Sequence, residues 1–148
     1  MSPGADGPMR APAKSEGTNG AAGRGGVYSD VIRQRWRRPL RRGSLPGANA
    51  VAEDVNPLCG DRVRMELDVD DTRVRDARFS GDSCAICTAS ADVLAERAAG
   101  GTVAEALAIE RETVLEVLDA DIRPTRMRCV TLPISVLRQA LGATGGGG

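Results

Sequence analysis

The clearest pattern along the chain is a strict alternation of apolar and charged residues over positions 62–69. The apolar members are Val63, Met65, Leu67 and Val69. A period of two residues places these side chains on one face of a β-strand and the charged side chains on the other. The segment is therefore predicted to be a strand with one buried and one solvated face, which is typical of antiparallel sheets.

Two further strands are predicted next to it. Residues 73–80 follow an acidic turn, but Val74 has the opposite parity to the apolar residues after it. A β-bulge near residues 75–76 would restore the register, because a bulge adds one residue to one strand. Residues 48–55 are predicted to form a short edge strand. The three segments together indicate a small antiparallel three-stranded sheet.

Residues 28–38 have the spacing of an amphipathic helix, which Pro39 ends. Its apolar stripe consists of Tyr28, Val31, Ile32 and Trp36. Arginines occupy the other face and continue into the next loop; this run consists of Arg33, Arg35, Arg37, Arg38, Arg41 and Arg42. Two interpretations of the run are open, a solvated helix face and a docking surface for an acidic partner protein.

Helices are also predicted for most of the second half of the chain. Residues 85–99 form an alanine-rich helix before a Gly-Gly pair. One side of this helix is apolar and consists of Ile86, Ala89, Val93 and Leu94. Thr102 and Glu105 have the spacing of a capping box, which opens a short helix, and a further helix is predicted over residues 111–118.

The last predicted helix follows a connector over residues 121–128. Its apolar positions are Val130, Ile134, Leu137 and Leu141. Pro133 must lie in the first turn of this helix or kink it, because an interior proline removes a backbone hydrogen bond. The order of strands followed by helices predicts an α+β domain in which helices pack on one face of the sheet.

Composition limits the predicted domain to residues 27–143. Residues 1–26 consist mainly of Gly, Ala, Pro, Ser and scattered charge and are predicted to be a disordered leader, and residues 144–148 a flexible glycine tail. No apolar stretch approaches the roughly 20 residues of a membrane-spanning helix, and no secretory signal is recognisable. The 20 basic and 20 acidic residues balance, which predicts neither nucleic-acid nor membrane binding. We expect a cytoplasmic protein.

The chain has four cysteines and no histidine, so any metal must be held by thiolates and carboxylates. In a reducing cytoplasm, cysteines indicate metal binding or reactive thiols rather than disulfides. Cys59, Cys84 and Cys129 all lie where one predicted element gives way to the next, and such junctions can converge at one end of a sheet. The amides of a helix start would favour a thiolate at Cys84. With Asp61 these residues offer three sulfurs and one oxygen, a set acceptable to zinc.

Cys87 lies three positions after Cys84 and has several interpretations. It could be a fourth sulfur ligand, a resolving thiol, or a small apolar residue buried in the helix. The C-x-x-C spacing after a strand also matches thiol-disulfide oxidoreductases, but that function leaves Cys59 and Cys129 unexplained. A structural zinc-binding interaction domain is a further alternative that requires no chemistry at the metal.

The candidate ligands lie in three short motifs. Residues 56–61 read N-P-L-C-G-D and resemble the N-P-x-C-G-D motif of the IscU/SufU/NifU iron-sulfur cluster assembly family. Residues 79–84 read F-S-G-D-S-C and resemble its F-x-G-x-G-C segment, and residues 126–129 read R-M-R-C and resemble the R-x-K-C segment of SufU proteins. The order of tyrosine, apolar pair, proline and glycine over residues 28–43 also follows the family, and the resemblance extends to about Leu141.

The resemblance implies a Cys3Asp site for zinc or for a transient [2Fe-2S] cluster, made of Cys59, Asp61, Cys84 and Cys129. It implies Cys59 as the acceptor of sulfur from a cysteine desulfurase of the SufS/IscS type, with apo iron-sulfur proteins or downstream carriers as recipients. Cys87, Arg126 and Arg128 are candidate auxiliary residues. Such a protein is a scaffold or a sulfur-transfer partner of a desulfurase rather than a stand-alone enzyme.

The chain departs from both branches of the family. Arg128 stands where IscU proteins have a histidine, and the insertion of SufU proteins between the last two motif cysteines is absent. Arg35 occupies the place of a family histidine, and Ser83 replaces a glycine beside Cys84. The missing histidine favours sulfur acceptance at a zinc site over an IscU-like scaffold, and no dedicated chaperone is expected as a partner.

Overall fold

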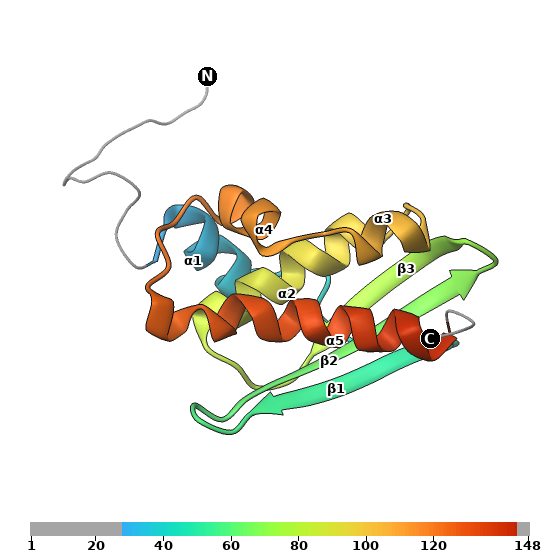
Figure 1. The fold of residues 1–148 in the computed structure, drawn as a ribbon, viewed down its shortest axis with the longest axis horizontal. Helices are drawn as coiled ribbons and strands as arrows, with labels where there is room; N and C mark the ends of the chain where they lie inside the picture. Colours follow the sequence, from blue (N-terminus) through green and yellow to red (C-terminus); the bar gives the residue numbers. More distant parts are fainter. Residues whose placement is uncertain (1–27, 145–148) are drawn as a thin grey trace, which may run out of the picture.

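A computed structural model describes residues 28–144, in which one sheet is covered by helices (Figure 1). The elements in chain order are α1 (Asp30–Arg37), β1 (Ala50–Asn56), β2 (Asp61–Asp70), β3 (Arg73–Ser80), α2 (Ala85–Ala98), α3 (Val103–Leu107), α4 (Arg111–Leu118), the 3-10 turn η2 (Pro124–Arg126) and α5 (Arg128–Thr144). The predicted leader and residues 145–148 of the predicted tail lie outside the described residues. Among the described helices, none is long and apolar enough to cross a membrane.

The sheet has the predicted antiparallel arrangement, with β2 between β1 and β3. Asn56 at the end of β1 pairs with Asp61 at the start of β2. Between β2 and β3 the register shifts, because Asp68 pairs with Asp76 whereas Val69 pairs with Val74. The residue between Asp76 and Val74 is the extra residue of a bulge, which confirms the bulge predicted from the change of parity.

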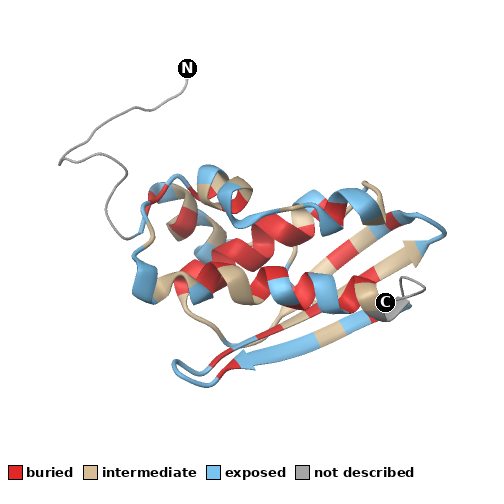
Figure 2. Cartoon of the chain, in the orientation of Figure 1, coloured by how far each residue is buried: buried red, intermediate tan, exposed pale blue. Residues whose placement is uncertain are grey.

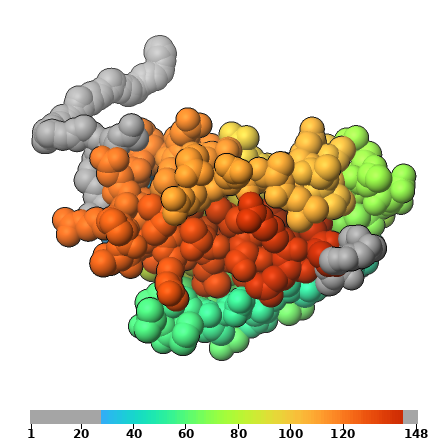
Figure 3. All heavy atoms as spheres, viewed as in Figure 1, coloured from blue at the N-terminus to red at the C-terminus, as the bar shows by residue number. Residues whose placement is uncertain are grey.

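Helices cover one face of the sheet, as predicted. The apolar side chains of β2 at Val63, Met65 and Leu67 are buried on that face. α5 packs against β1 and β2, and α2 packs against β3. In the space-filling view of Figure 3, α5 fills the region between β1 and the α3 and α4 layer. The molecule is therefore an α+β domain with an antiparallel sheet on one side.

α2 is the central helix. It is buried on more sides than the single apolar side that the sequence predicted. It is buried along most of its length, as the red ribbon in Figure 2 shows, because it contacts the sheet, α1, α4 and α5. Even Asp92 is fully buried on this helix. The many alanines of α2 allow neighbouring elements to approach from several sides. A prediction based on one apolar stripe misses the contacts on the other sides.

α1 corrects two expectations about the first helix. Ile32 is buried as predicted, but Trp36 is 50% exposed and does not belong to a buried stripe. Arg35, expected on the outer face, instead reaches α2 and pairs with Asp92 at 2.8 Å and Glu96 at 2.6 Å. The buried acid on α2 explains the difference, because a buried carboxylate requires a partner and Arg35 supplies it.

The start of α5 decides between the two alternatives predicted for Pro133. This helix begins at Arg128, so that Pro133 lies inside it, beyond the first turn. A proline here cannot donate the backbone hydrogen bond that would reach the carbonyl of Cys129, four residues earlier. The other helices predicted in this half are present, with ends that differ by at most two residues. The predicted capping box is confirmed, because the Thr102 and Glu105 side chains each accept a hydrogen bond from the other residue's backbone N–H.

Candidate metal centre

The turn between β1 and β2 presents Cys59 to solvent. Asn56 is buried, and its Oδ1 atom accepts a hydrogen bond from the N–H of Leu58 at 3.1 Å. The backbone carbonyl of Asn56 accepts a second bond from the N–H of Gly60 at 2.7 Å. Gly60 has a φ of 78°, a conformation that favours glycine. This turn leaves Cys59 exposed, while Asp61, two positions later, is buried.

Asp61 connects the segments of the site. Its side chain is buried, and Oδ1 accepts a hydrogen bond from the backbone N–H of Cys84 at 2.9 Å. Oδ2 accepts from the thiol of Cys59 at 3.1 Å and lies 3.6 Å from the thiol of Cys129. One carboxylate therefore contacts residues from three separate parts of the chain.

Cys84 is the residue that precedes α2 and caps its N-terminus. Its Sγ atom accepts a hydrogen bond from the backbone N–H of Cys87 at 3.4 Å. The thiol of Cys129 lies 3.5 Å from the same sulfur. The hydrogen bond from Cys129, the N–H of Cys87 and the nearby guanidinium of Arg126 lower the pKa of Cys84 to about 6, against the opposing effect of burial. Cys84 is thus the thiolate of the site.

Cys129 is buried at the second position of α5 and has the opposite ionisation preference. Its hydrogen bond to Cys84 raises the pKa of its thiol, and burial raises it further. The two sulfurs together hold one proton, which resides on Cys129 when Cys84 is charged. Arg126, in η2, lies beside both sulfurs and beside Tyr28, and these contacts raise the pKa of its guanidinium. The charge of Arg126 therefore balances one thiolate.

Cys59 differs from the other two thiols in its exposure and its charge state. The backbone N–H of Asp61 lowers the pKa of Cys59, but the carboxylate of Asp61 and burial outweigh it, so that the net shift is upward. Without a metal, Cys59 is therefore a neutral thiol hydrogen-bonded to a carboxylate. It is also the member of the site that another molecule can reach first.

The donor atoms already have the spacing of a metal site. The ligand atoms of Asp61, Cys84 and Cys129 all lie within 4.8 Å of one another. Bonds of about 2.3 Å at a tetrahedral angle would put two zinc-bound sulfurs roughly 3.8 Å apart, close to the observed 3.5 Å between Cys84 and Cys129. Cys59 lies outside this group of three and contacts it through the hydrogen bond to Asp61. The residues fit zinc, and the three thiols also suit an iron-sulfur cluster.

The structure places the other candidate residues around this group. Cys87 is fully buried in α2 and lies outside the three-residue cluster, and burial raises the pKa of its thiol. Arg126 is in contact with the cluster. Arg128 is exposed and instead lines a groove of about 320 Å³ between the end of β1 and α5, beside Pro57. Of the auxiliary candidates, Arg126 is therefore the one that acts on the sulfurs directly.

Sequence reasoning missed two contributions. Asn56 was part of a motif, but its role in holding the Cys59 turn through both its side chain and its carbonyl depends on local geometry. The pair of Arg35 with Asp92 holds α1 against α2, whose first turn carries the cysteines. The signal for this pair in the sequence was an aspartate in the middle of an alanine-rich helix, since a buried acid requires a partner.

Comparison with known proteins decides the family. Residues 27–144 match the family described as the NifU-like N terminal domain. The chain belongs to the NifU-like N-terminal domain family. This family assignment agrees with the fold and with the arrangement of three motif cysteines and one aspartate described above.

Relatives of this NifU-like domain carry two different descriptions. An iron-sulfur cluster assembly scaffold protein IscU 1 of Archaeoglobus fulgidus is 33% identical over 78% of this chain and 74% of its own length. A zinc-dependent sulfurtransferase SufU of Bacillus subtilis is 28% identical over 82% of this chain and 93% of its own length. The NifU-like domain is therefore similar to scaffolds and to a zinc-dependent sulfurtransferase.

Solved structures agree with this assignment. The crystal structure of a putative iron-sulfur cluster assembly scaffold for the SUF system, from Fervidobacterium islandicum, superposes with a TM-score of 0.68 at 28% identity. The match covers 78% of this chain and 96% of the other. A NifU-like protein from Brucella abortus shares the fold, with a TM-score of 0.69 at 21% identity over 82% of this chain and 96% of that one.

Proposed function

We propose that this protein accepts sulfur from a cysteine desulfurase at Cys59, within a zinc site completed by Asp61, Cys84 and Cys129. The contact of Asp61 with all three cysteines is the observation that carries this proposal, because it joins an exposed thiol to two inner sulfurs. The similarity to a zinc-dependent sulfurtransferase supports the same function. Recipients of the sulfur are apo iron-sulfur proteins or downstream carriers.

The transfer balances without an added oxidant. The thiolate of Cys59 attacks the outer sulfur of the donor's persulfide, the donor's S–S bond breaks, and the donor leaves as a thiolate. A new S–S bond forms on Cys59, which then carries the terminal sulfur. Bound zinc would supply a Lewis acid that keeps Cys59 deprotonated. For this step the chain provides an exposed Cys59 and, beside it, the carboxylate of Asp61, which accepts a hydrogen bond from the Cys59 thiol.

Asp61 and Arg126 have distinct roles in this proposal. Asp61 orients Cys59 and, as an oxygen ligand among sulfurs, keeps the site exchangeable. Arg126 offsets the negative charge of the inner thiolates, so that an incoming anionic persulfide meets less repulsion. Arg126 therefore supplies a compensating positive charge and does not itself accept sulfur.

The decisive experiment compares Cys59→Ala with wild type and a cognate desulfurase. We expect Cys59→Ala to abolish stimulation of the desulfurase and the gain of a sulfur atom on the intact protein, measured by mass spectrometry. Cys87→Ala is the matched control, because it removes a buried thiol outside the cluster. Unchanged stimulation by Cys59→Ala would refute the proposed acceptor.

A scaffold function is the second candidate, favoured by the Archaeoglobus fulgidus relative and by the three converging thiols. In this function Cys59, Cys84 and Cys129 hold a nascent [2Fe-2S] cluster, and Asp61 keeps it labile enough to leave. Metal and acid-labile sulfide content of protein purified without oxygen separates the two functions. Zinc without sulfide supports sulfur acceptance, and iron with sulfide supports the scaffold.

Two other functions fit the geometry less well. A redox pair of Cys84 and Cys87 requires an accessible second thiol, whereas Cys87 is fully buried and its pKa is raised. A purely structural zinc site requires that the metal hold the fold together, but the sheet and helices form a continuous apolar core of their own. Neither function explains the exposure of Cys59.

A further inference from the structure

The arginine run on and after α1 divides into paired and unpaired members. Four of the six contact partners in the same chain: Arg33 with Asp30, Arg35 with Asp92 and Glu96, Arg41 with Asp76, and Arg42 with the carbonyl of Gly81. Arg37 and Arg38 make no ion pair within the described part of the chain. The positive charges of these two adjacent arginines are therefore available to bind another molecule.

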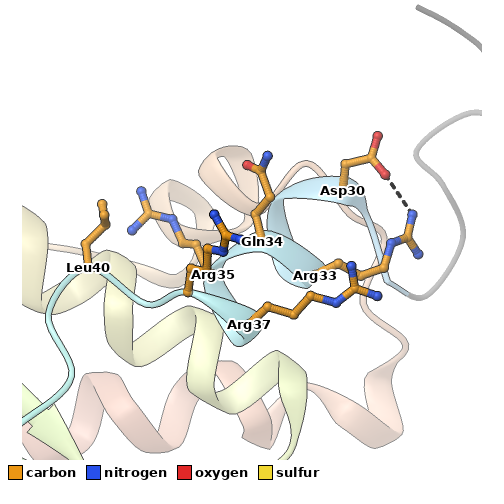
Figure 4. Close-up of a pocket in the computed structure, with 7 residues that line it drawn as sticks. Asp30, Arg33, Gln34, Arg35, Arg37 and Leu40 are labelled. Carbon is orange, nitrogen blue, oxygen red and sulfur yellow. Dashed lines mark hydrogen bonds and ion pairs between the residues drawn. The ribbon is translucent and has the colours of Figure 1, made fainter.

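These two arginines line an open hollow of about 630 Å³ on the surface of α1. Figure 4 shows the pair of Arg33 and Asp30 at one end of the labelled residues and Leu40 at the other. Leu40 is 59% exposed, and the neighbouring Trp36 is half exposed. The surface therefore combines unpaired positive charge with exposed apolar side chains, a mixture that distinguishes interaction sites from ordinary solvated helix faces.

We propose that Trp36, Arg37, Arg38 and Leu40 form a docking surface for an acidic segment of a partner protein, here termed the α1 surface. Carboxylates of the segment pair with the two arginines, and an apolar side chain of the segment packs against Trp36 and Leu40. Charge complementarity selects this occupant, because no acid among residues 28–144 pairs with Arg37 or Arg38. The proposal does not depend on sulfur transfer.

Other occupants fit the α1 surface less well. The chain's own first 27 residues contain two acidic and three basic side chains, so they do not complement a positive surface. Nucleic acid would need a series of stacking residues, whereas this chain has one tryptophan. A membrane surface would need a broad apolar helix face, but α1 has only eight residues, and Ile32 is buried against the domain.

Helix α1 lies near the elements that carry the cysteines. α1 packs on α2, and Figure 1 places α1 at the same end of the molecule as the β1–β2 turn and the start of α5. Tyr28, just before α1, lies beside Arg126, which contacts the inner sulfurs. Trp36 to Leu40 lie at and beyond the C-terminal end of α1, whereas Tyr28 precedes its N-terminus, so α1 itself connects the α1 surface with the candidate metal centre.

Trp36 is the only tryptophan of the chain, so its fluorescence reports directly on this surface. The probe is a short synthetic peptide of Glu and Asp with two leucines, and its control replaces every acid by the corresponding amide. We expect saturable binding of the acidic peptide that weakens with salt. Arg37→Glu/Arg38→Glu should weaken it by about tenfold or more, and Arg111→Glu/Arg138→Glu, with the same charge change elsewhere, by about twofold or less.

Each contrary outcome would overturn the proposal. These outcomes are no saturable binding, equal binding of the amide peptide, or equal loss in both double variants. Tighter binding of a single-stranded oligonucleotide or of phosphatidylserine vesicles, lost in Arg37→Glu/Arg38→Glu, would reassign the surface to nucleic acid or lipid. Circular dichroism establishes that each variant folds, and Arg37→Gln/Arg38→Gln replaces the charge reversal if the first variant does not.

Discussion

The carboxylate of Asp61 holds the backbone N–H of Cys84 at 2.9 Å, which links the start of β2 to the start of α2. This bond fixes two candidate ligands relative to each other before any metal is present. The same carboxylate reaches Cys59 with its second oxygen. Asp61 therefore serves both the fold and the site, and substitutions that separate charge from hydrogen bonding distinguish these roles.

We expect Asp61→Ala to lower the free energy of unfolding by about 1–3 kcal/mol, because the N–H of Cys84 loses its partner in a partly buried position. Asp61→Asn retains an oxygen acceptor of similar shape and should cost less. Urea denaturation measures both. Equal destabilisation by the two variants would contradict the assigned role of the hydrogen bond.

The same variants test the lability of a bound cluster. An oxygen ligand is exchanged more readily than a thiolate on a soft metal, so an iron-sulfur cluster on Asp61→Ala should persist longer than on wild type. The decay of visible absorbance in air measures this lifetime. A faster decay would contradict the account of Asp61 as the residue that keeps the site exchangeable.

Alkylation of the metal-free protein should identify Cys84 as the most reactive thiol near neutral pH. Its pKa of about 6 means that the thiolate predominates at pH 7 and is lost as the pH falls through that value. The pKa of Cys59 is raised, so its alkylation should accelerate only at higher pH although it is more exposed. Peptide mass spectrometry after iodoacetamide treatment between pH 5 and 9 measures both rates. Faster labelling of Cys59 at pH 6 would refute this order.

Two glycines should respond differently to alanine. At Gly81 a Cβ atom would lie 2.3 Å from the carbonyl oxygen of Arg62, and φ is 117°, so Gly81→Ala should destabilise the domain by about 3 kcal/mol or more. At Gly60 a Cβ atom would meet nothing within 4 Å, and only the backbone strain of about 1–2 kcal/mol remains. Denaturant unfolding checks the ranking, and a larger loss at Gly60 would contradict it.

The pair of Arg35 and Asp92 should contribute much more to stability than a surface pair. Asp92→Ala removes one of the two carboxylates that pair with the largely buried guanidinium of Arg35, and it leaves the N–H of Arg41 without its acceptor, so we expect a loss of about 3–5 kcal/mol. Arg33→Ala removes an exposed pair with Asp30 and should cost roughly 1 kcal/mol or less. Thermal unfolding of both variants provides the comparison, and similar losses would show that burial does not matter here.

Alternation and turn chemistry predicted most of the fold. The parity of β2, the bulge in β3 and the capping box at Thr102 all depend on neighbouring residues in sequence, and the structure confirms them. The errors arose where tertiary contacts override local pattern. Trp36 has the spacing of a buried residue but is half exposed. Arg35 instead faces α2, because it forms an ion pair with Asp92.

The sequence indicated which residues are candidate ligands, but not their protonation states. Motif spacing named Cys59, Asp61, Cys84 and Cys129 as candidate ligands; the structure places the last three in one cluster and Cys59 in contact with Asp61. The sharing of one proton between Cys84 and Cys129 depends on a sulfur-to-sulfur distance of 3.5 Å across 45 positions of the chain. The exposure of Cys59 beside buried partners likewise depends on the turn held by Asn56. No periodicity encodes such distances.

The order of the ligands along the chain has a consequence during synthesis. Cys59, Asp61 and Cys84 leave the ribosome before Cys129, yet the low pKa of Cys84 depends first on the hydrogen bond from Cys129. A nascent chain that lacks α5 therefore has neither the activated thiolate nor the third member of the cluster. Premature loading with metal is thereby disfavoured, because the centre is completed only when the final helix docks.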